Sequence, residues 1–168
     1  MTLHFGILTV SDRSSRGERP DLSGPALADF IRARGWDASL LDVVADERAQ
    51  IASTLTKWCA RGDLDVILTT GGTGFAPRDV TPEATRDVIE REAPGLAEAI
   101  RAESLKVTLH AMLSRAVAGI RGKTIIINLP GSPKGAVESL QSVAGVLEHA
   151  VKLVREDVDA EKGHGRVG

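Results

Sequence analysis

The feature that most constrains this chain is a short apolar segment that runs directly into glycines. Residues 66–70 read Val-Ile-Leu-Thr-Thr, and Gly71, Gly72 and Gly74 follow at once. A strand that is apolar on both faces is typical of the centre of a parallel sheet covered by helices on both sides. Glycine allows backbone conformations that other residues avoid. The segment therefore predicts an α/β fold with a functional loop at the end of a central strand.

The rest of the chain alternates between strand and helix patterns. Short apolar runs predict further strands at residues 3–10, 39–44 and 123–129, with a candidate edge strand at 117–120. Helical spacing between caps or breakers predicts helices at about residues 23–34, 47–61, 81–89, 96–105 and from 134 onward. We expect a mostly parallel sheet with helices on both faces, in a single domain over residues 1–155. The polar tail, residues 156–168, is expected to fray.

The last predicted helix carries one continuous apolar stripe. Its members step by three and four residues, at Val137, Leu140, Ala144, Leu147, Val151 and Val154. Packing on the sheet is the simplest use of this stripe, and a subunit contact is the alternative.

Composition excludes several classes of function. The 168 residues include 21 basic and 23 acidic side chains, and this near balance gives no field that would attract nucleic acid or an anionic membrane. No apolar stretch reaches the roughly 18 residues of a membrane span, and no signal peptide opens the chain, so we expect a cytoplasmic protein. The single cysteine, Cys59, lies at helical spacing among apolar residues and is expected to be a buried thiol.

The glycine-rich segment is a candidate phosphate site. Successive backbone N–H groups in such a loop can point at an anion, although the segment matches neither a Walker loop nor the dinucleotide-binding glycine motif. On the glycines alone, a tight turn without a ligand is an equally good interpretation. Three neighbours favour a site: Arg78 offers a donor fork, Asp79 a carboxylate, and Thr81 a hydroxyl at a helix start.

A second carboxylate occupies a similar place. Asp46 lies between a predicted strand and helix, where a helix N-cap is the local interpretation. Because it also follows the carboxyl end of a strand, Asp46 and Asp79 could face one ligand, and two carboxylates near phosphates suggest Mg²⁺. Residues 11–17, 71–79 and 130–134 follow the strongest strands, so these loops are expected to meet at one edge of the sheet.

Five segments together resemble one family. They are Val-Ser-Asp-Arg at 10–13, Asp-Leu-Ser-Gly-Pro at 21–25, Thr-Gly-Gly-Thr-Gly with Arg-Asp-Val-Thr-Pro-Glu within 70–83, Leu-Ser-Arg-Ala at 113–116, and Leu-Pro-Gly-Ser-Pro at 129–133. This combination resembles the molybdopterin adenylyltransferase family, MogA/MoaB type, over residues 5–153. The resemblance implies a molybdopterin-binding fold, usually trimeric. It also implies a reaction of molybdenum cofactor biosynthesis, in which the terminal phosphate of molybdopterin attacks the α-phosphate of ATP and releases pyrophosphate.

The resemblance also assigns roles to residues. Asp46 and Asp79 would be catalytic and would position Mg²⁺ and the phosphates. The other expected phosphate-, nucleotide- and pterin-binding residues are Ser11, Asp12, Thr70, Gly71, Gly72, Thr73, Gly74, Arg78, Thr81, Ser114, Arg115, Pro130, Gly131 and Ser132. ATP and molybdopterin would be the substrates, a homotrimer the assembly, and a molybdenum-insertion protein a candidate partner downstream. The alternative is a non-catalytic molybdopterin-binding carrier of the same fold, but a pure binder has no need of two carboxylates beside phosphates.

Overall fold

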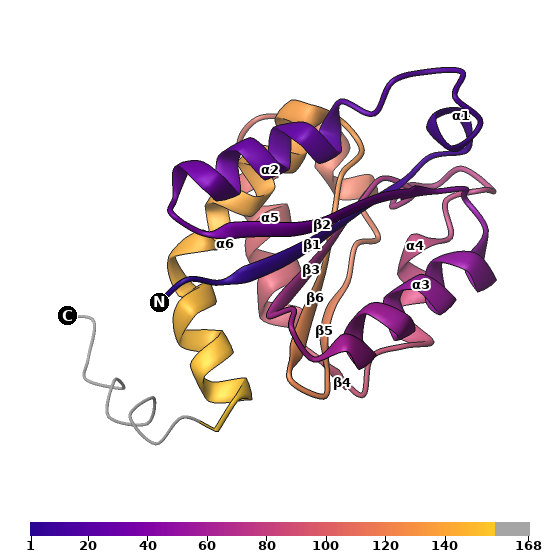
Figure 1. Ribbon diagram of the computed structural model, residues 1–168. Helices are drawn as coiled ribbons and strands as arrows, with labels where there is room; N and C mark the ends of the chain where they lie inside the picture. The colour runs from indigo at the N-terminus through magenta and orange to yellow at the C-terminus, as the bar shows by residue number, and fades with distance from the viewer. Residues whose placement is uncertain (157–168) are drawn as a thin grey trace.

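A computed structural model describes residues 1–156 and contains one sheet of six strands in the order β2-β1-β3-β6-β5-β4 (Figure 1). The strands are β1 (His4–Val10), β2 (Asp37–Val44), β3 (Val66–Thr70), β4 (Arg91–Glu92), β5 (Ala118–Arg121) and β6 (Thr124–Leu129). The first four in sheet order are mutually parallel, whereas β5 and β4 are antiparallel to their neighbours. The predicted mostly parallel α/β sheet is therefore confirmed.

Helices cover both faces of this sheet. They are α1 (Asp12–Ser15), α2 (Ser23–Ala33), α3 (Arg48–Arg61), α4 (Thr81–Arg86), α5 (Pro94–Leu105) and α6 (Pro133–Val154), with a 3-10 helix η1 (Leu109–Leu113). Figure 1 shows α2, α5 and α6 on one side of the strands and α3 and α4 on the other. Each side has its own buried apolar cluster.

The alternation of side chains along the central strands explains why these strands are apolar throughout. In β6, Ile125 and Ile127 pack into the cluster under α2, α5 and α6, whereas Ile126 packs into the cluster under α3 and α4. Successive residues of a strand point to opposite faces, so both faces of a doubly covered strand must be apolar. The stripe on α6 follows the same logic. Its central members Leu140 and Leu147 are fully buried in the first cluster, which confirms the packing interpretation.

Two predicted elements differ in the structure. The helix predicted at 81–89 ends at Arg86, and β5, predicted as an edge strand, lies between β6 and the short strand β4. Val88 and Ile89 supplied the helical pattern, but they belong to a turn that packs against the second cluster. The two residues of β4 are too few to give a sequence pattern.

A buried polar network lies beneath the carboxyl ends of the strands. Asn128 on β6 donates through Nδ2 to Thr69 Oγ1 and Thr85 Oγ1, each at 2.9 Å, and its Oδ1 accepts from the amide of Val117 at 3.1 Å. The side chain thereby joins β6, β3, α4 and the segment before β5.

Three further expectations concern the thiol, the tail and membranes. Cys59 is partly buried beside the second cluster, and burial raises the pKa of its thiol to about 11. The tail predicted to fray, residues 156–168, lies outside the described residues apart from Glu156. Within the described part of the chain, no helix is long and apolar enough to cross a membrane.

Candidate active site

The loops after β1, β3 and β6 meet at one edge of the sheet, as the sequence predicts. The Gly71 amide donates to Leu129 O at 3.1 Å, and Thr70 Oγ1 donates to Pro130 O at 2.7 Å. A Cβ on Gly131 would lie 3.3 Å from Gly71 Cα, and a Cβ on Gly71 would collide with the carbonyl oxygen of Val10. The backbones of three loops therefore approach one another more closely than side chains would allow.

Two of the glycines also have backbone angles that favour glycine. Gly71 has φ 104° and Gly72 has φ 66°, both in the left-handed region. A Cβ on Gly72 would collide with Thr81 Oγ1 and lie 3.0 Å from Asp46 Oδ1. A Cβ on Gly74 would lie 2.9 Å from Asp79 Oδ2. The glycines therefore let the loop run between the two candidate catalytic carboxylates.

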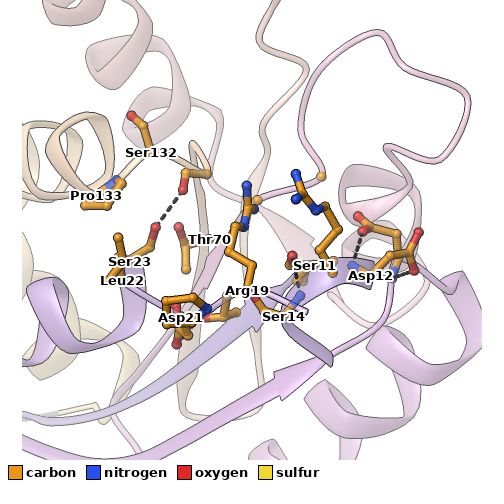
Figure 2. Close-up of a pocket in the computed structure, with 18 of the residues that line it drawn as sticks. Ser11, Asp12, Ser14, Arg19, Asp21, Leu22, Ser23, Thr70, Ser132 and Pro133 are labelled. Carbon is orange, nitrogen blue, oxygen red and sulfur yellow. Dashed lines mark hydrogen bonds between the residues drawn. The ribbon is translucent and has the colours of Figure 1, made fainter. Parts of the chain in front are cut away.

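A cavity of about 700 Å³ opens at this edge (Figure 2). Nine of the predicted site residues line it: Ser11, Asp12, Asp46, Thr70, Gly71, Gly72, Asp79, Gly131 and Ser132. Both candidate catalytic acids are therefore among its walls. Sequence reasoning assigned no site role to several other lining residues, among them Arg13, Arg19, Asp21 and Ser23. Arg13, Asp21 and Ser23 belong to the segments 10–13 and 21–25 that carry the family resemblance, whereas Arg19 lies between these segments and had no signal in the sequence.

A second cavity, of about 280 Å³, lies on the other side of the glycine loop between α5, η1 and the start of α6. Four other predicted site residues line this one: Thr73, Gly74, Ser114 and Pro130. Ser132 lines both cavities, and its hydroxyl caps α6 by accepting from the Gly135 amide at 3.1 Å. The loop that was predicted to bind phosphate therefore lies between two hollows.

Asp46 is held by a reciprocal pair of hydrogen bonds with Asp12. The Asp12 amide donates to Asp46 Oδ2 at 2.8 Å, and the Asp46 amide donates to Asp12 Oδ1 at 3.0 Å. The N-cap of α3 is Glu47, which makes no side-chain capping bond. The local N-cap interpretation of Asp46 is therefore wrong, because its carboxylate is turned to the loop after β1.

The pKa values of Asp46 and Asp12 are shifted in opposite directions. Burial raises the pKa of Asp46, and the charges of Asp12 and Asp79 raise it further. The pKa of Asp12 is lowered, chiefly by its hydrogen bonds with Arg78. Asp79 is fixed by the Ala76 amide, which donates to its Oδ2 at 3.0 Å. Asp46 is thus a partly buried carboxylate among like charges.

Arg78 does not line either cavity, although it was predicted to bind phosphate. Its Nε and Nη2 donate to the two carboxylate oxygens of Asp12 at 2.6 and 3.1 Å, and Nη2 also donates to Glu47 at 2.7 Å. The planar fork that suits a phosphate suits a carboxylate equally well. The structure therefore uses Arg78 to position Asp12, and through it Asp46.

Thr81 is fully buried behind the glycine loop. Its hydroxyl donates to Gly71 O at 2.9 Å, and its amide donates to Gly72 O at 3.1 Å. The hydroxyl therefore braces the loop from the first turn of α4, and Thr81 is not among the residues that line the larger cavity.

Arg115 braces the second half of the same loop and lines neither of the two cavities. Its amide donates to Thr73 O at 2.8 Å, and its guanidinium donates to Gly74 O at 2.8 Å and Asp79 O at 2.6 Å. Glu83 forms an ion pair with the same guanidinium, and these bonds lower the pKa of Glu83. The guanidinium therefore contacts backbone carbonyls of the loop.

These two braces orient the loop. They bind the carbonyl oxygens of four successive residues, 71–74. In a trans peptide the C=O of one residue and the N–H of the next point in opposite directions. The N–H groups of residues 72–75 therefore point away from Thr81 and Arg115. Backbone amides that are turned away from their braces are available to an anion.

The pair of acids offers oxygen ligands of the kind that Mg²⁺ prefers. No cluster of three or more His, Cys, Asp or Glu side chains suited to a metal occurs within residues 1–156. Any metal held here would therefore need oxygens from a substrate or from water to complete its coordination.

Comparison with known protein families assigns the chain to one of them. Residues 6–149 match the family described as a probable molybdopterin binding domain. The chain belongs to this family. The predicted resemblance, and the molybdopterin-binding fold that it implied, are thereby confirmed.

Three similar proteins place the chain within the family. A molybdopterin adenylyltransferase of Helicobacter pylori J99 is 44% identical over 155 residues, which cover 91% of this chain and 88% of that protein. The molybdenum cofactor synthesis protein cinnamon of Drosophila melanogaster is 46% identical over 168 residues, and these span 28% of its length. The crystal structure of the molybdopterin biosynthesis enzyme MoaB from Thermus thermophilus is 51% identical, with a TM-score of 0.87 over 93% of this chain and 98% of that one.

Proposed function

We propose that the protein is a molybdopterin adenylyltransferase, which transfers AMP from ATP to the terminal phosphate of molybdopterin in molybdenum cofactor biosynthesis. The observation that carries the proposal is the pair Asp46 and Asp79 in one cavity, on either side of a loop whose amides face away from its braces. The name of the Helicobacter pylori relative supports the same activity.

The reaction needs alignment more than it needs a reactive side chain. An oxygen of the molybdopterin phosphate forms a bond to the α-phosphorus of ATP, the bond from that phosphorus to the bridging oxygen breaks, and pyrophosphate leaves. The substrate itself supplies the nucleophile, so the protein contributes positioning and charge stabilisation. Two hollows of about 700 and 280 Å³ flank the loop, which gives two substrates room to meet beside it.

The carboxylates fit an expected Mg²⁺ ion. Burial and the charges of Asp12 and Asp79 raise the pKa of Asp46, so a cation near this carboxylate would relieve an unfavourable arrangement. Asp46 and Asp79 would hold the ion together with phosphate oxygens, and the ion would neutralise phosphate charge as the leaving group departs. The bond from the Asp12 amide fixes one Asp46 oxygen and leaves the other beside Gly72.

The test is pyrophosphate release from ATP by the purified protein with molybdopterin and Mg²⁺. We expect turnover by the wild type and a loss of about 100-fold or more in Asp79→Asn and Asp46→Asn, as is usual when a group that stabilises transition-state charge is removed. Asp29→Asn is the matched control, since Asp29 is an exposed carboxylate on α2 that lines no cavity.

Three outcomes separate the proposal from its rival. Wild-type protein that binds molybdopterin but releases no pyrophosphate would establish the non-catalytic carrier. Full turnover by Asp79→Asn would remove the role given to that residue. Equal losses in Asp29→Asn would trace the effect to net charge and not to the site.

Assembly and location follow from the same proposal. We expect a homotrimer in the cytoplasm, with a molybdenum-insertion protein as the next user of the product. Exposed Val107, Leu109 and Met112 gather around η1, and subunit contacts would cover such apolar side chains. Sedimentation equilibrium tests the trimer, and a monomer at micromolar concentration would refute it.

A further inference from the structure

Arg19 is a cavity-lining cation that has no side-chain partner among residues 1–156. It lies in the loop between α1 and α2, and within the described chain its guanidinium makes no ion pair or side-chain hydrogen bond. Figure 2 shows its side chain extending across the hollow, between Ser11 and Ser14 on one side and Asp21 and Thr70 on the other. A long flexible side chain left unpaired beside a polar cavity is available to a ligand.

The larger cavity is lined by more carboxylates than cations, so a free guanidinium there is important for binding an anion. Four carboxylates line the larger cavity, those of Asp12, Asp21, Asp46 and Asp79. The only cationic side chains among its lining residues are Arg13 and Arg19. The cations expected to bind phosphate, Arg78 and Arg115, are engaged with carboxylates and loop carbonyls. A polyphosphate entering this cavity would therefore need Arg13 of α1 or Arg19 of the loop that follows it.

The backbone around Arg19 is well positioned for this role. On one side, the Glu18 amide donates to Arg13 O at 2.9 Å and closes the turn after α1. On the other, Asp21 accepts from Thr9 Oγ1 at 2.9 Å and from the Gly24 amide at 3.1 Å. Pro20 follows Arg19 and restricts it to extended conformations. The arginine is thus held between two anchored points at the edge of the cavity.

We propose that Arg19 binds the β- and γ-phosphates of the nucleotide and the pyrophosphate formed from them. This inference rests on the proposed function for the identity of the nucleotide. A guanidinium can bind phosphate through two parallel hydrogen bonds. Arg19 lines the same cavity as Asp46 and Asp79, which on the proposed function hold the reacting phosphates, and it lies in a solvent-exposed loop that a departing pyrophosphate could reach.

The experiment measures binding of inorganic pyrophosphate, ATP and AMP by calorimetry in Mg²⁺ buffer. Arg19→Gln removes the charge at nearly constant size, and Arg19→Lys keeps the charge without the fork. Arg16→Gln is the matched control, because Arg16 belongs to the same loop but pairs with Glu18 and does not line the cavity. Both positions changed, 16 and 19, are exposed, so folding is expected to persist.

We expect Arg19→Gln to weaken pyrophosphate and ATP binding about tenfold, the loss typical of one charge-assisted contact. Arg19→Lys should recover part of this, whereas AMP binding and the Arg16→Gln protein should change by less than about twofold. Equal losses for AMP and ATP, or equal losses in the two glutamine variants, would overturn the inference.

The result is separable from the proposed reaction. Pyrophosphate binding that depends on Arg19 in a protein that never transfers AMP would leave this inference standing and refute the transferase. Normal turnover with unchanged nucleotide and pyrophosphate binding in Arg19→Gln would support the transferase and refute the role of Arg19.

Discussion

Replacing Thr81 by valine is expected to destabilise the glycine loop by removing a hydrogen bond to its backbone, not by removing a contact to a ligand. The Thr81 hydroxyl is fully buried and donates to Gly71 O at 2.9 Å. Valine has nearly the same shape but no donor, so the Gly71 carbonyl loses this partner. A buried acceptor left without its hydrogen bond costs about 1–3 kcal/mol. In a chain of this size, 2 kcal/mol corresponds to a drop of about 4–8 °C in Tm.

The assay is urea unfolding of the wild type, Thr81→Val and Thr81→Ser, followed by pyrophosphate release from each. Serine keeps the donor and loses one methyl group, so it should cost about 1 kcal/mol and keep most of the turnover. The valine variant should lose both stability and turnover, because its loop no longer holds Gly71 in place. Valine protein as stable as the wild type, but unable to bind substrate, would show that the hydroxyl contacts a ligand and would refute the brace.

Three further predictions concern the core and the titratable groups. Asn128→Leu orphans the Val117 amide and removes three hydrogen bonds, so the free energy of unfolding should fall by about 3 kcal/mol in urea titrations, and an unchanged midpoint would contradict the network. Because the pKa of Asp46 is raised in the folded protein, the contribution of this group to the free energy of unfolding is fully present at a pH below its ordinary value of 3.8. That contribution is lost as pH rises through the raised folded value. Asp46→Asn should therefore gain stability relative to the wild type as pH rises from about 3.5 to about 7, and a difference that does not change with pH in urea titrations would contradict the raised pKa. Burial raises the pKa of Cys59 to about 11, so a disulfide reagent at pH 8 should modify the folded protein about 100-fold more slowly than the urea-unfolded chain, and equal rates would show an accessible thiolate.

Most of the fold was predictable because the central strands are apolar on both faces. The pattern of residues 66–70 and 123–129 can be explained only by helices on both sides, and the intervening helical segments supply them. The strand β4 was not predictable. It has two residues, and the bond from the Glu90 amide to Ile120 O depends on a partner 30 positions away.

The difference between local patterns and contacts to distant partners also explains which parts of the candidate site were predictable. The glycines and both acids were predictable, since their chemistry is local: Gly71 and Gly72 need positive φ, and Asp46 and Asp79 follow strand ends. The partners of Thr81 and Arg115 were not, because a hydroxyl or a guanidinium near a loop can bind either a ligand or the backbone. Residue type and spacing do not separate these uses.

The contacts of Thr81 and Arg115 make the backbone of the glycine loop a candidate ligand-binding group. Thr81 and Arg115 together bind the carbonyls of residues 71–74, and each bound carbonyl turns the next N–H to the opposite side. A loop held in this way has its amides oriented before substrate arrives, so little free energy is spent on ordering it during the reaction. Direct contacts to phosphate from the Thr81 hydroxyl and the Arg115 Nε would have left the carbonyls of Gly71 and Gly74 without these donors. On the proposed function, the acids, the braced amides and Arg19 would be complementary parts of one site: the acids would hold a cation, the amides the reacting phosphates, and the arginine the phosphates that leave.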